Sequence, residues 1–250
     1  MDRDDAMRAL CDANAGRAAF YRVLAGYFYQ ELKEDDLEAL RARDLLAGVG
    51  EGPLRDGLKA MQRYLRGKRF GARQELASDY ARTFLAADTY DERRATPYES
   101  VFTSAEGLLM QDARDDVYRR FCEEGLAVDT AEAFVPEDHL SFEFEFMALM
   151  CDKANDALAR GDVAEAARAL RVQRDFSTDH QLNWIAKLCD TVEAVARTSF
   201  YRGLSQVTRA FVHDDAQTIA SLVEVAEGLE APCANADTAL CGACGHACVA

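Results

Sequence analysis

The sequence EAFVPEDHLSFEFEFMALMC, residues 132–151, is the most informative about the fold. Pro136 suits the first turn of a helix, where its missing N–H removes no hydrogen bond. Val135 precedes a proline and is therefore biased away from helical backbone. We predict that a helix begins near Pro136, with Glu137 and Asp138 in its first turn, where the helix dipole favours negative charge.

This predicted helix carries apolar side chains on two opposite faces. One face is formed by Leu140, Phe144, Met147 and Cys151, and the other by Phe142, Phe146, Leu149 and Met150. A surface helix has one apolar stripe, whereas a helix that is apolar on two sides is buried between its neighbours. We therefore expect a central helix whose acidic N-terminus emerges from the core. His139 and Glu143 lie one turn apart and are expected to pair along it.

The composition favours a helix-rich globular protein with an acidic surface. Of the 250 residues, 49% are hydrophobic and only 4 are proline, and the formal net charge is −15. This charge disfavours nucleic acid as a partner, because phosphates would be repelled, and it favours a basic partner. The N-terminus MDRDDAMRAL lacks the apolar stretch of an export signal, and no apolar run is long enough for a membrane helix. We expect a cytoplasmic protein without stable membrane insertion.

Apolar residues at helical spacing predict further helices along the chain. These helices cover residues 5–31, 35–47, 53–65, 75–86, 105–124, 164–176 and 215–228. Thr178 and Gln181 form a capping-box pattern, which predicts the start of another amphipathic helix. The predicted fold class is therefore all-α, with a single globular domain over residues 1–230 around the central helix and a Cys-rich tail over residues 231–250.

The sequence contains no motif of a nucleotide-hydrolysing or metal-dependent enzyme. The basic loop RGKRFG, residues 66–71, does not match the phosphate-binding pattern GxxxxGK[ST]. HExxH and paired ExxH motifs are also absent, which disfavours a helical-bundle metalloenzyme. An enzyme that uses Asp138 and His139 as an acid–base pair, on a nucleotide for example, stays an alternative interpretation. No nucleophile or cofactor motif accompanies these two residues.

Four separated segments resemble a single protein family. They are RAAFYRVLA (17–25), LASDYARTFL (76–85), PYESVF (97–102) and PEDHL (136–140), the last followed by Glu143 and Met147. These segments are similar to the TorD/DmsD/NarJ-like chaperones, which are all-helical cytoplasmic maturation factors for molybdenum-containing oxidoreductases. Several members bind the twin-arginine leader of their client. Phe144 stands where the family usually has Leu, and Phe102 where it has Tyr.

The resemblance implies a chaperone rather than an enzyme, with no cofactor required. Its partner would be the leader, the apo-form, or both, of a molybdopterin-dependent oxidoreductase catalytic subunit, and it would assist cofactor insertion and hold back export. Because an arginine fork pairs with carboxylates, an apolar groove with an acidic mouth would suit such a leader. The expected client-binding residues are Glu137, Asp138, His139, Glu143, Tyr98 and Ser100. The alternative is an ordinary capped helix and inter-helix turn, and a homodimer is compatible with either interpretation.

The tail concentrates potential metal ligands. Cys233, Cys241, Cys244 and Cys248 lie within sixteen residues, and His246 lies among them. The spacing Cys-x2-Cys is that of a metal knuckle, and four thiolates suit Zn or an iron–sulfur cluster. Cytoplasmic cysteines are more often reduced or metal-bound than paired in disulfides. Two interpretations stay open: a flexible appendage without metal, or a metal- or redox-handling protein that acts through these thiols.

Overall fold

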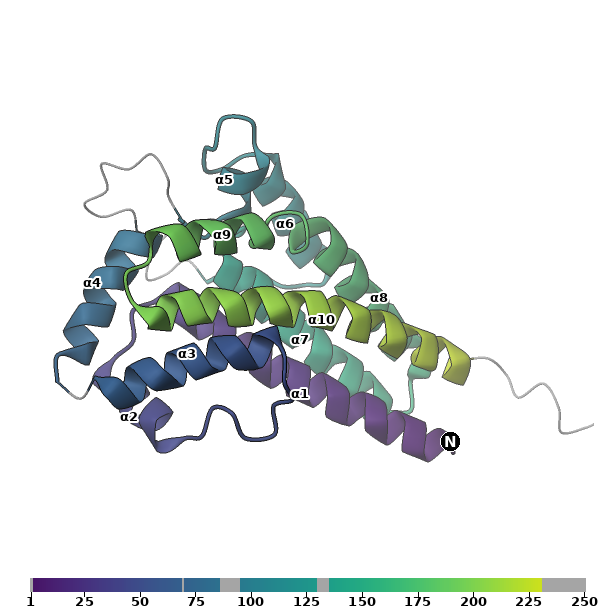
Figure 1. Ribbon diagram of the computed structural model, residues 1–250. Helices are drawn as coiled ribbons and strands as arrows, with labels where there is room; N and C mark the ends of the chain where they lie inside the picture. Colours follow the sequence, from purple (N-terminus) through teal and green to yellow (C-terminus); the bar gives the residue numbers. More distant parts are fainter. Residues whose placement is uncertain (1, 69, 86–94, 130–134, 231–250) are drawn as a thin grey trace, which may run out of the picture.

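The computed structural model describes residues 2–68, 70–85, 95–129 and 135–230, and within these ranges the fold consists of ten helices (Figure 1). They are α1 (Arg3–Tyr29), α2 (Glu34–Ala42), α3 (Pro53–Gly67), α4 (Ala72–Phe84), α5 (Glu99–Thr103), α6 (Asp112–Glu123), α7 (Leu140–Ala159), α8 (Val163–His180), α9 (Ile185–Val195) and α10 (Ser199–Glu230). The predicted all-α fold class is confirmed. Among the described helices, none combines the length and the apolar character needed to cross a bilayer.

Helix α7 is the buried centre of the bundle and packs between α1 and α8. Phe144, on one face, contacts Tyr21 of α1 with ring centroids 5.6 Å apart. Phe146, on the other face, lies 4.5 Å from Phe176 of α8. Both phenylalanines are buried, as predicted, but Leu149 is 41% exposed. The prediction of a two-faced central helix is therefore confirmed, with one apolar position left at the surface.

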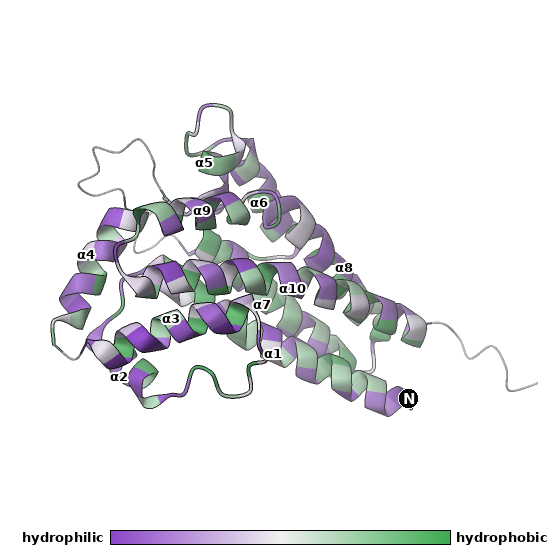
Figure 2. Ribbon diagram, viewed as in Figure 1, coloured by the Kyte–Doolittle hydropathy of each residue, from purple (hydrophilic) through white to green (hydrophobic). Residues whose placement is uncertain are grey.

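Helix α10 is the longest helix described, and it packs against α3, α8 and α9 (Figure 1). It is a single helix of 32 residues that begins at Ser199. The prediction of a separate helix over residues 215–228 therefore placed the start of this helix too late. The backbones of α3 and α10 approach closely at Gly57 and Gly203. A Cβ atom added at Gly57 would lie only 2.7 Å from the carbonyl oxygen of Gly203. In Figure 2, α3 and α10 alternate hydrophilic and hydrophobic residues, as expected for helices with one buried face.

Further predicted boundaries differ from the structure, and one of them is the end of α2, which lies at Ala42 and not at residue 47. Helix α8 continues to His180, and the Thr178 hydroxyl donates to the carbonyl oxygen of Arg174 at 2.9 Å instead of capping a new helix. The reason is that Phe176 and His180 bury the same face of α8, so packing favours continuation of the helix. Helix α6 begins at Asp112, later than predicted, because residues 104–111 form a loop.

Candidate functional site

The segment in front of α7 is a turn, not the first turn of the helix. The amide of His139 donates to the carbonyl oxygen of Pro136 at 3.1 Å. His139 then caps α7, because its Nδ1 accepts a hydrogen bond from the amide of Ser141 at 3.2 Å. The predicted helix start at Pro136 is therefore wrong. A proline at this position also suits a turn, and residues 136–139 pair with a distant segment instead of continuing the helix.

That distant segment is the entry to α5, and together the two form the centre of the candidate site. Tyr98 and His139 form an antiparallel bridge, and the amide of Glu99 donates to the carbonyl oxygen of Asp138 at 3.0 Å. The Ser100 amide donates to Asp138 Oδ2 at 2.9 Å, and the Ser100 hydroxyl donates to the same oxygen. Four of the six predicted client-binding residues, Tyr98, Ser100, Asp138 and His139, are therefore brought into contact across the fold.

Two carboxyl groups at this junction are buried without full hydrogen bonding. Asp138 and Glu143 both have 0% exposure. Among the described residues, Asp138 Oδ1 and both side-chain oxygens of Glu143 have no hydrogen-bond partner. Most buried polar atoms in folded proteins do have a partner, so three such oxygens at one place require an explanation.

The electrostatics of these two carboxyls follow from their burial. Burial raises the pKa of Asp138. It also raises the pKa of Glu143 well above its usual value, and the negative charges of Glu99 and Asp138 add to that shift. The Trp184 indole lies close enough to Glu143 to oppose the shift, but its N–H donates to the carbonyl oxygen of His180 at 2.6 Å. Glu143 therefore holds its proton more strongly than an exposed glutamate does.

The predicted pairing of His139 with Glu143 is not present. His139 uses Nδ1 as the cap of α7, and neither oxygen of Glu143 has a partner within the described ranges. The imidazole of His139 lies among aromatic side chains. The centroid of the Tyr98 ring is 4.8 Å from that of His139, and the centroid of the Phe142 ring is 6.0 Å from it. Burial lowers the pKa of His139 to about 4, so the imidazole is neutral at pH 7. It orients the turn and carries no charge there.

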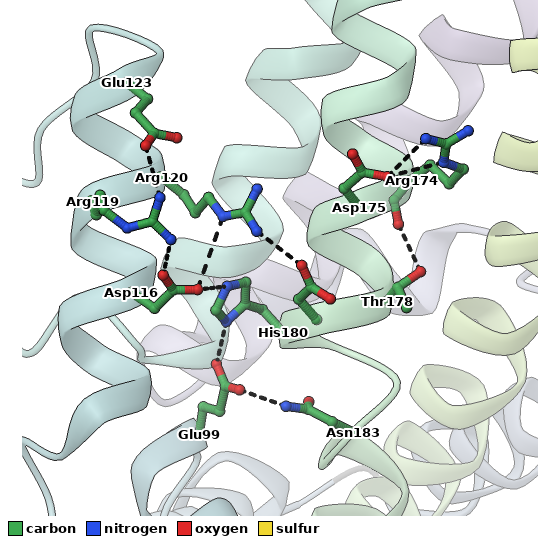
Figure 3. A network of polar contacts seen from close by, with 11 residues as sticks. Glu99, Asp116, Arg119, Arg120, Glu123, Arg174, Asp175, Thr178, His180 and Asn183 are labelled. Atoms are coloured by element: carbon green, nitrogen blue, oxygen red, sulfur yellow. Dashed lines mark hydrogen bonds and ion pairs between the residues drawn. The ribbon is translucent and has the colours of Figure 1, made fainter.

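A third buried carboxylate, Glu99, was not predicted from the sequence. Its Oε2 lies 2.9 Å from His180 Nδ1, and its Oε1 accepts a hydrogen bond from Asn183 at 2.7 Å. Figure 3 shows the His180 ring between Glu99 and Asp116, whose Oδ2 lies 2.9 Å from Nε2. The sequence signal was present, since Glu99 belongs to the segment PYESVF, but its partner lies 81 residues further along the chain.

Glu137, the remaining predicted residue, is already bound to an arginine of this chain. Both of its oxygens accept hydrogen bonds from Arg114 of α6, from Nε at 2.6 Å and from Nη2 at 2.9 Å. The guanidinium of Arg114 also lies over the ring of Tyr118, 5.2 Å from its centroid. The geometry is the bidentate fork expected between an arginine and a carboxylate, and here it joins α6 to the turn before α7.

An apolar groove lies beside the same end of α7. It encloses about 230 Å³. Its apolar lining includes Phe121, Leu126, Val128, Phe142, Phe146 and Leu149. Glu145 also lines it, is half-buried, and has its pKa raised by that burial. Because Phe142 contacts His139 and lines the groove, the acidic junction and the groove are neighbours.

In the part of the chain that the structure describes, no three His, Cys, Asp or Glu side chains form a group that could hold a metal ion. The four described cysteines, Cys11, Cys122, Cys151 and Cys189, are free thiols. Burial raises the pKa of Cys151 and of Cys189 to about 12, so neither is a ready ligand. The predicted tail ligands Cys233, Cys241, Cys244 and Cys248 lie outside the described residues.

Comparison with known proteins identifies the family. A family model described as "Nitrate reductase delta subunit" matches residues 51–190, which is more than half of the chain. This chain belongs to the TorD/NarJ-like family of molybdoenzyme maturation chaperones. The resemblance predicted from the four sequence segments is thereby confirmed. The matched range includes every predicted client-binding residue, and Glu99 and His180 as well.

Curated relatives of this TorD/NarJ-like chaperone match along most of their length. Each is named "Chaperone protein TorD", which describes a role without catalysis. The Vibrio parahaemolyticus protein is 29% identical over 209 residues, covering 79% of this chain and 92% of its own length. The relative from Vibrio cholerae (strain ATCC 39541) is 28% identical over 226 residues, covering 87% and 98%. The relative from Psychrobacter sp. is 26% identical over 219 residues, covering 85% and 95%.

Proposed function

We propose that this protein is a cytoplasmic chaperone that binds the twin-arginine leader, the apo-form, or both, of a molybdopterin-dependent oxidoreductase subunit. Through that binding it would assist cofactor insertion and hold back export. The observation that carries this proposal is the pair of buried carboxyls, Asp138 and Glu143, with three oxygens lacking partners in the described structure. Family membership supports the chaperone role, and the carboxyl pair supports the arginine-bearing ligand.

A guanidinium supplies the hydrogen-bond donors that the oxygens of these two carboxyls lack. Arginine carries five N–H donors in a rigid planar fork and keeps its charge when buried. Since Asp138 and Glu143 are inaccessible to solvent, binding requires that the Tyr98–His139 bridge opens. That bridge joins two short non-helical segments, so it can separate without unfolding a helix. Glu137 is a third carboxylate at this place, and it already accepts an arginine fork from Arg114.

The raised pKa of Glu143 couples binding to protonation. Burial and the neighbouring negative charges raise this pKa in the free protein. A guanidinium placed beside the carboxyl would favour its ionised form and lower the pKa. Leader binding should therefore release a proton, and the affinity should fall as the pH is lowered from the pKa of Glu143 in the free protein to its lower pKa in the complex.

The apolar part of a leader has a neighbouring surface on which to pack. The groove formed by Phe142, Phe146 and Leu149 begins one turn of α7 beyond His139. A leader in which arginines precede an apolar run would meet the carboxyls first and the groove second. In this proposal Asp138, in front of α7, meets the arginines, and the groove along α7 takes the apolar run that follows them.

The direct test is binding of a synthetic peptide with two adjacent arginines followed by an apolar run. We expect a dissociation constant near micromolar, about −8 kcal/mol. Asp138→Asn or Glu143→Gln should weaken binding roughly ten- to a hundredfold, because one charge-assisted hydrogen bond contributes about 1.5–3 kcal/mol. Asp152→Asn, at an exposed position of the same helix, is the matched control and should bind as wild type does.

A second peptide separates recognition from general charge attraction. A twin-lysine peptide of equal charge should bind distinctly worse at physiological salt, since lysine cannot form the bidentate fork. Equal binding of the two peptides, unaffected by either carboxyl change, would show that this site does not recognise a twin-arginine leader. An anaerobic pull-down from the native host should recover a molybdoenzyme subunit as the main partner.

The tail supports a second candidate function, metal or redox handling. Its four cysteines are concentrated in sixteen residues, whereas Cys151 and Cys189 in the folded domain are buried with a pKa of about 12. Purified protein should carry near-stoichiometric Zn or Fe, and Cys241→Ser with Cys244→Ser should remove it. Protein purified anaerobically without metal, with four freely reactive tail thiols, would contradict this candidate.

A further inference from the structure

One stretch of this acidic chain has the opposite charge. From Pro53 to Arg73 the sequence holds seven basic residues and a single acidic one, Asp56. In the rest of the chain acidic residues outnumber basic ones by 21, with 43 against 22. The basic stretch forms α3, the turn after it and the start of α4, so its charge is concentrated on one part of the molecule (Figure 1).

The C-terminal half of α3 presents basic side chains that are available to a partner. Arg63 and Arg66 are exposed, and neither forms an ion pair with any other described residue. Lys59 and Gln62 join them in lining a shallow hollow of about 510 Å³. Lys59 and Lys68 do pair with acids of this chain, at 3.2 and 3.0 Å, but partly exposed pairs of this kind are weak and exchange easily.

An aromatic side chain projects from the turn that follows these cations. Phe70 is 91% exposed, more than any other large apolar residue that the structure describes. Gly67 ends α3, and Gly71 adopts a left-handed φ of 69° directly before α4. The turn between the two helices is therefore short, and it holds Phe70 outside the core. A single exposed apolar residue is ordinary, but an aromatic ring next to a group of cations is the combination that membrane interfaces attract.

We propose that this α3–α4 cluster binds the surface of a membrane that contains anionic phospholipids. The members of the cluster are Lys59, Arg63, Arg66, Lys68 and Phe70. Each basic residue near an anionic membrane raises the affinity roughly fivefold, and the aromatic ring enters the headgroup region. In Figure 1 the turn lies at the lower left and α5 at the top, so a membrane bound at the cluster leaves the junction in front of α7 open. The inference goes beyond the proposed function and requires neither a leader nor a client.

The net charge of −15 does not prevent this contact. At physiological salt charges are screened beyond about 8 Å, so acids on the other faces contribute little at the membrane surface. Helix α2 packs against α3 and has acids in its first turn, but its Arg41 donates to the carbonyl oxygen of Lys68 at 3.0 Å and brings a further cation to the turn. A single-stranded nucleic acid is the poorer partner, because its bases stack on several aromatic rings along a groove, and the cluster offers one ring at the tip of a turn.

The test is cosedimentation of the full chain with vesicles at physiological salt, without any peptide. Vesicles of phosphatidylglycerol and phosphatidylcholine in equal parts should bind the protein at least about tenfold more tightly than vesicles of phosphatidylcholine alone. Arg63→Gln with Arg66→Gln should weaken binding to the anionic vesicles by roughly tenfold or more. Because neither arginine has an ion-pair partner in the described structure, the melting temperature should stay within about 2 °C of wild type. Arg160→Gln with Lys187→Gln makes the same charge change at exposed positions on α9 and at the end of α7, and this control should bind as wild type does.

Phe70→Ser separates the contribution of the aromatic ring from that of the charges. It should weaken binding to the anionic vesicles severalfold and leave the dependence on salt unchanged, because an apolar contact is not screened. The double arginine variant should instead bind with a flatter dependence on salt. Leu85→Ser, at a position 63% exposed after the other end of α4, is the matched control for Phe70→Ser and should bind as wild type does.

The outcomes separate this inference from the proposed function. Equal binding to the two kinds of vesicle, no binding to either, or equal weakening by the two double variants would overturn the inference and leave leader recognition intact. Protein that ignores the vesicles but binds a single-stranded RNA oligonucleotide, and loses it in the Arg63 and Arg66 variant, would assign the cluster to nucleic acid and would also overturn it. Failure of the twin-arginine peptide to bind would contradict the proposed function alone, because the vesicle assay contains no peptide.

Discussion

The polar clusters around Arg17 and around Glu143 are both buried against α7, but their hydrogen bonding differs. Arg17 of α1 donates to both oxygens of Asp215 of α10, at 2.6 and 3.0 Å, and to Gln173 at 2.7 Å. The Tyr21 hydroxyl also donates to Asp215. Every charge in this cluster is paired, although the side-chain nitrogens of Asn14 and Gln173 have no partner there. Around Glu143, by contrast, Asp138 Oδ1 and both side-chain oxygens of Glu143 have no hydrogen-bond partner among the described residues.

This difference indicates two roles for buried polar groups in one fold. The Arg17 cluster ties α1, α8 and α10 together, and removing one partner would leave a buried charge uncompensated. The Glu143 cluster lowers stability, because each unsatisfied buried polar group costs about 1–3 kcal/mol. An arrangement that costs stability is explained more readily by ligand binding than by folding.

The largest expected effect is that of Arg17→Ala. It leaves Asp215 buried without its counter-charge, so the free energy of unfolding should fall by about 3–5 kcal/mol. For a chain of this size the melting temperature should drop by roughly 6–20 °C. Arg22→Ala, on the same helix in an exposed pair with Asp152, should change stability by less than about 1 kcal/mol. If Arg17→Ala and Arg22→Ala have the same melting temperature, the Arg17 cluster does not stabilise the fold more than the exposed Arg22–Asp152 pair does.

A comparable loss is expected from Phe146→Ala, on the face of α7 that packs against α8. Phe146 contacts Phe121 and Phe176, with ring centroids at 5.0 and 4.5 Å. The resulting cavity should lower the free energy of unfolding by about 3–5 kcal/mol, measured by chemical denaturation. Phe144→Ala, on the opposite face, should cost a similar amount, whereas half-exposed Leu149→Ala should cost about 1 kcal/mol or less. Melting of both phenylalanine variants within a degree or two of wild type would refute the central position of α7.

A smaller, pH-dependent effect is expected from Glu143→Gln. The pKa of Glu143 is raised in the folded state, so between its unfolded pKa and that raised value the folded protein holds a proton that the unfolded chain releases. Stability of the wild type should therefore fall as the pH rises through this range, by at most about 1.4 kcal/mol per pH unit. Glu143→Gln removes this contribution, so the variant should gain stability relative to wild type from pH 5 to pH 7.

His139 provides the internal check on this pH dependence. Its pKa is lowered to about 4 by burial, so it reduces stability as the pH falls below about 6.5. This contribution has the opposite sign and is present in both proteins, so it cancels in the difference. A difference in unfolding free energy that is constant from pH 5 to pH 7 would mean that Glu143 is not held protonated by the fold.

The helical core was predictable from sequence because it depends on local periodicity. The spacing of Phe144 and Phe146 identified a helix that is apolar on two faces, and the structure buries both. The segments PYESVF and PEDHL identified Tyr98, Ser100, Asp138 and His139, which meet in the fold. These features depend on residues close together in the sequence, where local patterns predict structure most reliably.

The parts that were not predicted depend on contacts between distant segments. The start of α7 was misplaced because a proline suits both a turn and a first helical turn, and only the pairing with Tyr98 decides between them. The contact of Glu99 with His180 joins residues 81 positions apart. The expected His139–Glu143 pair is absent, and His139 instead uses its Nδ1 to cap α7. In each case tertiary packing overrides a valid local pattern.

The most direct test of the central claim measures stability and leader-peptide affinity in the same two variants. Arg17→Ala, assayed at a temperature where it stays folded, should lose stability and keep the affinity of wild type for the twin-arginine peptide. Glu143→Gln should keep its stability or gain some, and bind the peptide roughly ten- to a hundredfold more weakly. If Glu143→Gln binds the peptide as tightly as wild type, or weakens binding only in proportion to a loss of folded protein, the unpaired carboxyls are not the leader-binding site.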